Sequence, residues 1–222
     1  MLDAATKVVN VVDIPVFCDG DTGYGNAVNL KRTVQGYAKA GVACIMLEDQ
    51  VSVKKRCGHT RGKEVVGFEE SIMRIKAAVD AREESGCDIL IMARTDARET
   101  HGFQHAVDRC QAFVELGADI TFLEAPLSVE EMEAYCRHVP GSKMANMLEN
   151  GKTPILPGDE LEKMGFKIAA YPFAVLNASI VGMQKALQQL KEGKSPSNLS
   201  FQELQEIVGF DRYFEEEDRY SV

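Results

Sequence analysis

The sequence predicts an α/β fold, and within that class a TIM-type (β/α)8 barrel. Short apolar runs alternate with longer amphipathic stretches, which is the pattern of repeated βα units around a parallel sheet. Charged or amide residues follow five of the six strand-like runs, and a barrel gathers its strand ends at one mouth. An open, doubly wound sheet is the competing fold, but the chain lacks a G-x-G-x-x-G loop.

The individual elements have separate signals. Runs rich in apolar or β-branched residues predict strands at 14–18, 43–47, 88–93, 120–123, 143–147 and 167–170. Amphipathic periodicity predicts helices at 29–40, 69–84, 104–116, 129–138, 159–164 and 175–192. Four helices run into a glycine, which is typical of left-handed C-terminal caps: Gly41, Gly86, Gly117 and Gly165.

Composition predicts an ordinary globular protein with a peripheral tail. We assign residues 1–194 to a barrel domain and residues 195–222, which include an acidic run, to a C-terminal extension. The net charge of −9 argues against nucleic-acid binding, and no apolar run reaches the roughly 18 residues of a membrane span. Six cysteines without a C-x-x-C pair predict free thiols. We therefore expect a reducing compartment, the cytoplasm or an organelle stroma such as that of a plastid, and not secretion.

The segment 54–63 is the most informative for chemistry. It sets Cys57 among five full positive charges and an imidazole, in a chain that is acidic overall. Cationic neighbours favour the thiolate form of a cysteine, and glycines let the backbone bend closely around a ligand. The segment predicts a site for an anionic small molecule with Cys57 at its centre. The alternative is a solvated basic loop that contains a cysteine by coincidence.

Two carboxylates on a glycine-rich turn predict a divalent cation. Asp19 and Asp21 directly follow the first predicted strand, and Glu48 follows the second. Hard oxygen ligands suit Mg²⁺, with Mn²⁺ as an alternative. Ordinary turn chemistry and helix capping are the competing interpretations. A cation that faces the basic thiol segment predicts a pocket for small di- or tricarboxylates, without nucleic acid or membrane as partner.

Six short motifs follow one another along the chain: DGDTGYG at 19–25, LEDQ at 47–50, KRCGH at 55–59, ARTDA at 93–97, EAP at 124–126 and ANM at 145–147. In order and spacing they resemble the isocitrate lyase/phosphoenolpyruvate mutase superfamily. The resemblance runs from about residue 2 to the C-terminus. It is strongest to the branch of methylisocitrate lyase, dimethylmalate lyase and petal death protein, together with the plant chloroplast carboxyvinyl-carboxyphosphonate phosphorylmutases.

This resemblance implies a Mg²⁺-dependent lyase that cleaves a C–C bond of a 2-hydroxy di- or tricarboxylate, giving a 2-oxoacid and a carboxylic acid. Methylisocitrate-, dimethylmalate-, citramalate- and oxaloacetate-like substrates are the candidates. By resemblance, Cys57 is the acid that protonates the carbanion left by cleavage. The other roles implied by the resemblance are a metal site at Asp19, Asp21 and Glu48, a carboxylate clamp at Arg94, and substrate positioning by Gly58, His59, Glu124 and Asn146.

Two other functions stay open. A mutase that rearranges a P–C bond resembles this scaffold, and Lys54, Lys55 and Arg56 could contact a phosphoryl group. The family pattern has eight strands, whereas this chain starts at what resembles the end of the second helix. The resemblance therefore implies a barrel that lacks its first two βα units, either a fragment of an active lyase or a non-catalytic scaffold. The apolar helix at 175–192 predicts a homo-oligomer, a dimer or a tetramer.

Overall fold

The computed structural model describes residues 1–196 and 199–221. The chain divides into two compact units, Met1–Pro172 and Phe173–Val222. The first holds a parallel sheet with its helices, and the second is helical. Compactness alone does not define a domain, so the expected division at residue 194 stays a prediction.

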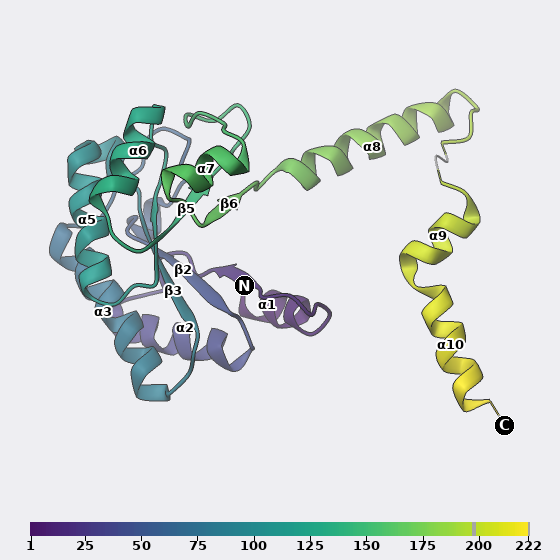
Figure 1. Cartoon of the computed structure of the whole chain (residues 1–222), viewed down its shortest axis with the longest axis horizontal. Helices are drawn as coiled ribbons and strands as arrows, with labels where there is room; N and C mark the ends of the chain where they lie inside the picture. Colours follow the sequence, from purple (N-terminus) through teal and green to yellow (C-terminus); the bar gives the residue numbers. More distant parts are fainter. Residues whose placement is uncertain (197–198, 222) are drawn as a thin grey trace. The chain divides into compact units, whose positions relative to one another are not determined.

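A six-stranded sheet forms the frame of the first unit. Figure 1 shows the sheet with helices packed around it. Every neighbouring pair is parallel, and the strand order equals the sequence order. Because the order never reverses, the sheet winds in one direction like a barrel wall, which excludes the doubly wound alternative. The strands are β1 (Phe17–Asp19), β2 (Cys44–Glu48), β3 (Leu90–Thr95), β4 (Ile120–Leu123), β5 (Ser142–Asn146) and β6 (Ile168–Ala170).

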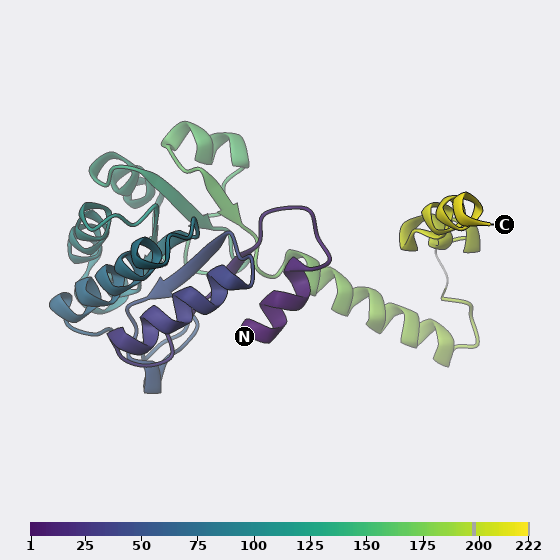
Figure 2. The same ribbon diagram turned by 90° about the horizontal axis from the view of Figure 1, so that it is seen from below.

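Helices cover the outer face of this curled half-barrel (Figures 1 and 2). They are α2 (Ala27–Lys39), α3 (Phe68–Ser85), α5 (Phe103–Glu115), α6 (Val129–His138) and α7 (Gly158–Met164). The N-terminal helix α1 (Leu2–Val9) contacts α2, the short α4 (Ala97–His101) follows β3, and the 3-10 helix η1 (Ser52–Lys54) follows β2. The fold class predicted from the sequence is confirmed. Gly86 and Gly165 adopt the left-handed conformation that the cap prediction requires.

Alternation along the strands divides the buried side chains between the two faces of the sheet. Ile45 and Leu47 of β2 belong to the cluster that packs against α2 and α3. Cys44 and Met46 of the same strand belong to a second cluster on the inner face, together with Met92, Ile120, Phe122, Met144 and Ile168. Successive side chains of a strand point to opposite faces, so one strand serves both clusters.

The second unit contains α8 (Ala174–Lys191), α9 (Phe201–Val208) and α10 (Phe210–Tyr220). Large apolar side chains of α8 are exposed within the chain, among them Val175, Val181, Met183 and Leu187. Among the described residues, no helix combines the length and the hydropathy that crossing a bilayer requires. All six cysteines are free thiols, as predicted from their spacing.

Candidate active site

Four polar residues of the site stand on the inner face because strands alternate. Side chains two positions apart on a strand share a face. The backbone N–H of Glu124, one residue beyond β4, donates to the Thr95 carbonyl at 3.0 Å and so continues the pairing of β4 with β3. Each of the four follows an inner-face apolar residue by two positions: Glu48 after Met46, Arg94 after Met92, Glu124 after Phe122, and Asn146 after Met144.

Arg94 lies at the centre of this group. Its guanidinium donates to both oxygens of Asp96, at 2.8 and 3.1 Å, and its carbon lies 5.2 Å from the centre of the Phe122 ring. The same guanidinium lies 3.4 Å from Glu48 Oε2 and 3.6 Å from Glu124 Oε2. Burial works to raise the pKa of Asp96, but Arg94 and Lys63 outweigh it and hold that pKa below its usual value. Asp96 thus fixes an arginine that faces two further carboxylates.

A buried ion pair behind the site holds Asp96 in place. Asp49 Oδ1 accepts from the backbone N–H of Asp96 at 2.9 Å, and its Oδ2 accepts from the Thr95 hydroxyl at 2.6 Å. The Arg109 guanidinium donates to the same Oδ2 at 2.9 Å, and both side chains are 1% exposed. This pair connects α5 to the ends of β2 and β3, and through Asp96 it supports Arg94.

The three predicted metal ligands lie around one cation of the chain itself. The Lys55 ammonium forms an ion pair with Asp21, and it lies 3.7 Å from Glu48 Oε1 and 3.9 Å from Asp19 Oδ2. Asp21 has a left-handed φ of 51°, and its backbone N–H donates to Asp19 Oδ1 at 2.7 Å. The turn therefore directs two carboxylates towards the end of β2.

Glu48 is the residue of this cluster that fits a divalent ion best. It is 3% exposed, and neither of its carboxylate oxygens has a hydrogen-bond partner. An unpartnered buried carboxylate costs free energy unless a cation compensates it. No three His, Cys, Asp or Glu side chains in the described ranges are arranged to hold a metal ion in this structure, in which the Lys55 ammonium lies among the three carboxylates. The donor set fits Mg²⁺ in its chemistry, and Mg²⁺ stays a prediction.

Replacing Glu48 by glutamine is expected to stabilise the metal-free protein at alkaline pH. Burial raises the pKa of Glu48 to about 8, from an ordinary value of 4.5, although Arg94 opposes this. A raised folded-state pKa contributes stability below the unfolded value, and that stability is lost as the pH rises through the folded value. The wild type should therefore lose unfolding free energy between about pH 5 and pH 8, at up to about 1.4 kcal/mol per pH unit, and E48Q should not.

Urea unfolding of both proteins in EDTA at pH 5 and pH 8 measures this difference. The exposed Glu84→Gln variant is the matched control, because Glu84 forms a surface pair with Lys31 at 2.6 Å. The prediction would be contradicted if the urea midpoint of E48Q changed between pH 5 and pH 8 by the same amount as that of the wild type.

The segment that carries Cys57 is held from both sides. The Gln50 side chain donates to the Arg56 carbonyl and accepts from the Arg56 N–H, both at 2.9 Å. The buried Lys63 ammonium donates to the Gly58 carbonyl at 2.6 Å and lies 3.1 Å from Asp96 Oδ1. Cys57 itself is exposed, and its carbonyl accepts from the Thr60 N–H at 3.0 Å and from the Thr60 hydroxyl at 2.8 Å. Both neighbours of the thiol are thus fixed through their backbone.

Gly58 and His59 bring this segment against Glu124. A Cβ on Gly58 would overlap the Glu124 carboxyl group. His59 Nδ1 accepts from the Lys152 N–H at 2.8 Å. Its Nε2 lies 2.8 Å from Glu124 Oε1 but is not aligned for a hydrogen bond. Asn146 Nδ2 donates to the same oxygen at 3.4 Å.

Replacing Gly58 by alanine is expected to detach the segment from Glu124. The new methyl group meets buried carboxyl atoms instead of a flexible surface side chain, so the segment has to move. We expect cleavage by trypsin within 54–61 to become faster, because the moved segment exposes its lysines and arginines. Gly67→Ala is the matched control, since a Cβ there has nothing within 4 Å. Equal cleavage rates in the two variants would contradict the prediction.

The structure therefore gathers all nine predicted site residues on two connected clusters at the strand ends. Glu124 joins the segment around Cys57 to Arg94, and Glu48 contacts both Arg94 and Lys55, which pairs with the aspartates. The sequence interpretation missed the anchoring roles of Gln50 and Lys63. Gln50 is 0% exposed although amides are usually at the surface, but burial is not readable from one sequence.

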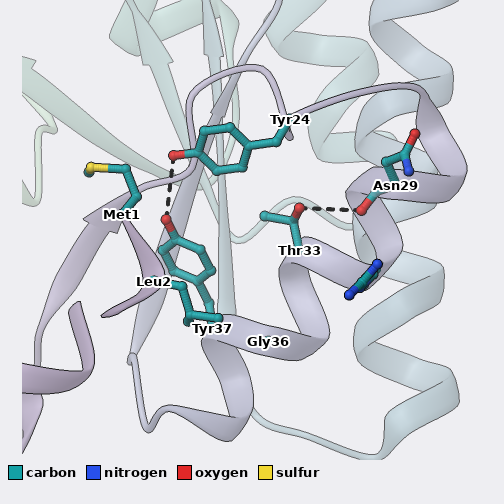
Figure 3. A pocket seen from close by; sticks show the side chains of 8 residues that line it. Met1, Leu2, Tyr24, Asn29, Thr33, Gly36 and Tyr37 are labelled. Atoms are coloured by element: carbon teal, nitrogen blue, oxygen red, sulfur yellow. Dashed lines mark hydrogen bonds between the residues drawn. The ribbon is translucent and has the colours of Figure 1, made fainter. Parts of the chain in front are cut away.

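A cavity of about 380 Å³ lies behind the aspartate turn (Figure 3). The Tyr37 hydroxyl donates to the Asp19 carbonyl at 3.2 Å and lies 3.5 Å from the Tyr24 hydroxyl. The cavity shares none of the nine predicted site residues, and its lining supports the turn from the outer side. It is lined by Met1, Leu2, Tyr24, Asn29, Arg32, Thr33, Gly36 and Tyr37.

A singly wound parallel sheet with carboxylates, a buried arginine and a cysteine segment at its strand ends defines an α/β half-barrel with a site for anionic ligands. The chain belongs to the phosphoenolpyruvate mutase/isocitrate lyase family. The family model described as phosphoenolpyruvate phosphomutase matches residues 1–191. The resemblance found in the sequence is thereby confirmed.

Individual relatives of this chain include a lyase, a phosphorylmutase and a hydrolase. The chain is 44% identical over 227 residues to 2,3-dimethylmalate lyase of Eubacterium barkeri, covering 100% of this chain and 78% of that protein. It is 40% identical to the chloroplastic carboxyvinyl-carboxyphosphonate phosphorylmutase of Arabidopsis thaliana, covering 98% and 66%. The structure of oxaloacetate acetylhydrolase with the inhibitor 3,3-difluorooxalacetate superposes with a TM-score of 0.90 at 33% identity, covering 98% and 75%. The chain thus spans about two thirds to three quarters of these proteins' length, and its homologues include lyases.

Proposed function

We propose that this chain carries the site of a Mg²⁺-dependent carbon–carbon lyase for 2-hydroxy di- or tricarboxylates. The observation that carries the proposal is the docking of the Cys57 segment on Glu124, which adjoins Arg94 and through it the carboxylate of Glu48. A candidate proton donor, a guanidinium and a carboxylate cluster then lie on connected segments at the strand ends. Relatives named dimethylmalate lyase and methylisocitrate lyase support the same reaction class.

The reaction would consist of cleavage of a C–C bond followed by protonation of the resulting carbanion. The substrate hydroxyl loses its proton to a base, the bond between C2 and C3 breaks, and the electron pair moves to C3 as an enolate-like carbanion. The Cys57 thiol then donates its proton to that carbon, so a 2-oxoacid and a carboxylic acid leave. When bound, Mg²⁺ would stabilise the negative charge on the 2-oxoacid oxygens. Arg94 would hold a substrate carboxylate, because a guanidinium matches a carboxylate in geometry and charge.

Substrate positioning is assigned to the Glu124 group. Gly58, His59 and Asn146 all contact this carboxylate, which leaves its Oε2 without a hydrogen-bond partner. An unpartnered buried acceptor beside Arg94 supports a role in orienting a polar substrate group. Asp19, Asp21 and Glu48 stay the candidates for holding the metal, directly or through water.

The runner-up is a P–C bond rearrangement, favoured by the name of the plant relative. Of the three cations that could contact a phosphoryl group, Lys54 pairs with Glu64 and Lys55 lies among carboxylates. Only Arg56 then stays uncommitted among these three in the described structure, which favours the lyase. A third function, a scaffold without catalysis, predicts no turnover at all.

The test is release of 2-oxoacid from a panel of 2-hydroxy di- and tricarboxylates, with Mg²⁺ and with EDTA. It uses the 222-residue chain and a version extended upstream by two βα units. Mg²⁺-dependent release by either protein is the expected result. Conversion of carboxyvinyl-carboxyphosphonate, followed by ³¹P NMR, with silence in the oxoacid assay would favour the mutase. Silence in both assays from both proteins would overturn catalysis.

We also propose that the protein is a homo-oligomer in a reducing compartment. The exposed apolar side chains of α8 support self-association, because monomers rarely expose large contiguous apolar patches. Six free thiols support the cytoplasm or an organelle stroma. Sedimentation equilibrium of the wild type and of a Val181→Glu variant tests the first point.

A further inference from the structure

Lys55 differs from the other cations of the basic segment in where its charge lies. Lys54 forms a pair with Glu64 at 2.5 Å, and both side chains are about half exposed. Lys63 is buried against the Gly58 carbonyl and Asp96. The Lys55 ammonium alone among these three lysines lies within 4 Å of Asp19, Asp21 and Glu48. Lys55 is thus the lysine of the basic segment that faces all three carboxylates, while the Arg94 guanidinium lies 3.4 Å from Glu48 as a second cation.

The Lys55 ammonium compensates part of the negative charge of the cluster but leaves the Glu48 oxygens without hydrogen bonds. The ammonium pairs with Asp21, but its separation from Glu48 Oε1 is 3.7 Å, and both Glu48 oxygens keep no hydrogen-bond partner. A divalent ion brings twice the charge and binds oxygens at close range, about 2.0–2.1 Å for Mg²⁺. Two cations at this spacing in a partly buried pocket repel each other strongly. The ammonium and the divalent ion therefore compete for the same carboxylates.

We propose that Lys55 is an internal counter-cation that lies where a divalent ion would bind to Asp19, Asp21 and Glu48, and that a bound divalent ion displaces it. This rests on the metal site of the proposed function and extends it. Lys55 is a positioning residue here, because it acts on the carboxylates and not on the substrate.

Displacement of Lys55 changes how the Cys57 segment is held. Lys55 stands two residues before Cys57, and the Gln50 side chain holds the intervening Arg56 by its backbone. Lys63 holds the Gly58 carbonyl on the other side. Lys55 is thus one of several tethers, and the ion removes it while the other two remain. Ion binding is therefore coupled to the freedom of residues 51–55.

Mn²⁺ affinity measures the competition directly. Electron paramagnetic resonance of free Mn²⁺ gives the affinity of the full 222-residue chain for the wild type, Lys55→Gln, Lys55→Arg and Lys54→Gln. We expect K55Q to bind Mn²⁺ at least about tenfold more tightly, because it loses the competing charge. K54Q removes one exposed, screened charge from the neighbouring position and should stay within about twofold of the wild type. K55R keeps the charge and should resemble the wild type.

Limited trypsin digestion measures the coupling. Cleavage after Lys54 is expected to accelerate when Mn²⁺ is added to the wild type, because residues 51–55 lose a tether. In K55Q the same bond should be cleaved at the faster rate with or without Mn²⁺. A purely electrostatic effect of residue 55 on the metal would leave this cleavage independent of Mn²⁺ in both proteins.

Four results would overturn the proposal: no Mn²⁺ binding by wild type and K55Q alike, equal affinities for the two proteins, equal tightening by K54Q and K55Q, or cleavage after Lys54 in the wild type that does not change with Mn²⁺. Neither readout involves turnover. A chain that binds Mn²⁺ competitively with Lys55 but releases no 2-oxoacid would refute the lyase and keep this inference. A chain that releases 2-oxoacid in the presence of Mg²⁺ but binds Mn²⁺ equally well in the wild type and in K55Q would keep the lyase and refute this inference.

Discussion

Replacing Cys57 by serine is expected to lower Mg²⁺-dependent 2-oxoacid release by about 10²–10⁴-fold, the usual contribution of a positioned general acid. A serine hydroxyl is a far weaker acid than a thiol, so it does not deliver the proton to the carbanion. The fold should be unaffected, because Cys57 is exposed and its contacts with Thr60 involve only the backbone carbonyl. The measurement is the rate of oxoacid release by the catalytically active form, with circular dichroism as the check on folding.

Cys87→Ser is the matched control for this substitution. Cys87 is a partly buried thiol before β3, with its sulfur 3.2 Å from the Ser85 hydroxyl, at the opposite end of the strands from the site. Its replacement should leave the rate unchanged. A folded C57S protein with the wild-type rate would remove Cys57 from the chemistry and leave the basic segment as a binding element alone.

Replacing Arg109 by methionine is expected to destabilise the protein by about 3–5 kcal/mol, which is the cost of leaving a buried charge without its partner. Methionine keeps much of the apolar volume beside Phe68, over which the guanidinium lies at 6.0 Å. What it removes is the charge opposite Asp49, whose side chain is 1% exposed. Urea unfolding followed by circular dichroism measures the change in free energy.

Lys76→Met provides the comparison, because the pair of Lys76 with Asp80 at 2.9 Å lies on the surface of α3. Exposed pairs contribute about 0–1 kcal/mol, so this variant should unfold close to the wild type. The double variant R109M with Asp49→Asn should recover part of the loss, since asparagine carries no charge and still accepts from Thr95 or Asp96. If R109M unfolded within about 1 kcal/mol of the wild type, the pair would not be the support for Asp96 described above.

Much of the fold was predictable because strands and helices of this kind leave local signals. All six strands and the six predicted helices lie where periodicity and glycine caps place them, within three residues at each end. The largest shift is at β1, which begins at Phe17 and not at residue 14. Pro15 has no N–H to donate to a ladder, so regular pairing starts only where Phe17 lies opposite Cys44.

The site was predictable in its residue types and not in its contacts. Polar residues after apolar runs, together with family motifs, identified Arg94, Glu124 and Asn146. Nothing local distinguishes Lys55, which lies among carboxylates, from Lys63, which is 5% exposed and binds a carbonyl. Their different surroundings come from Asp19, Glu48 and Asp96 at the ends of three separate strands, which only the register of the sheet brings together. The two hydrogen bonds between the Gln50 side chain and the Arg56 backbone likewise depend on the path of the chain after β2.

The alternation that places an apolar residue two positions before each polar one has a consequence for how such a protein can change over evolutionary time. Substitutions at Glu48, Arg94, Glu124 or Asn146 alter the chemistry at the mouth while the layer beneath stays packed. Insertion of a single residue within β2, β3 or β5 would instead exchange the two faces of that strand and lose packing and chemistry together. New specificities are therefore expected to arise by exchange of side chains at strand ends and by changes of loop length beyond them, with strand lengths held constant.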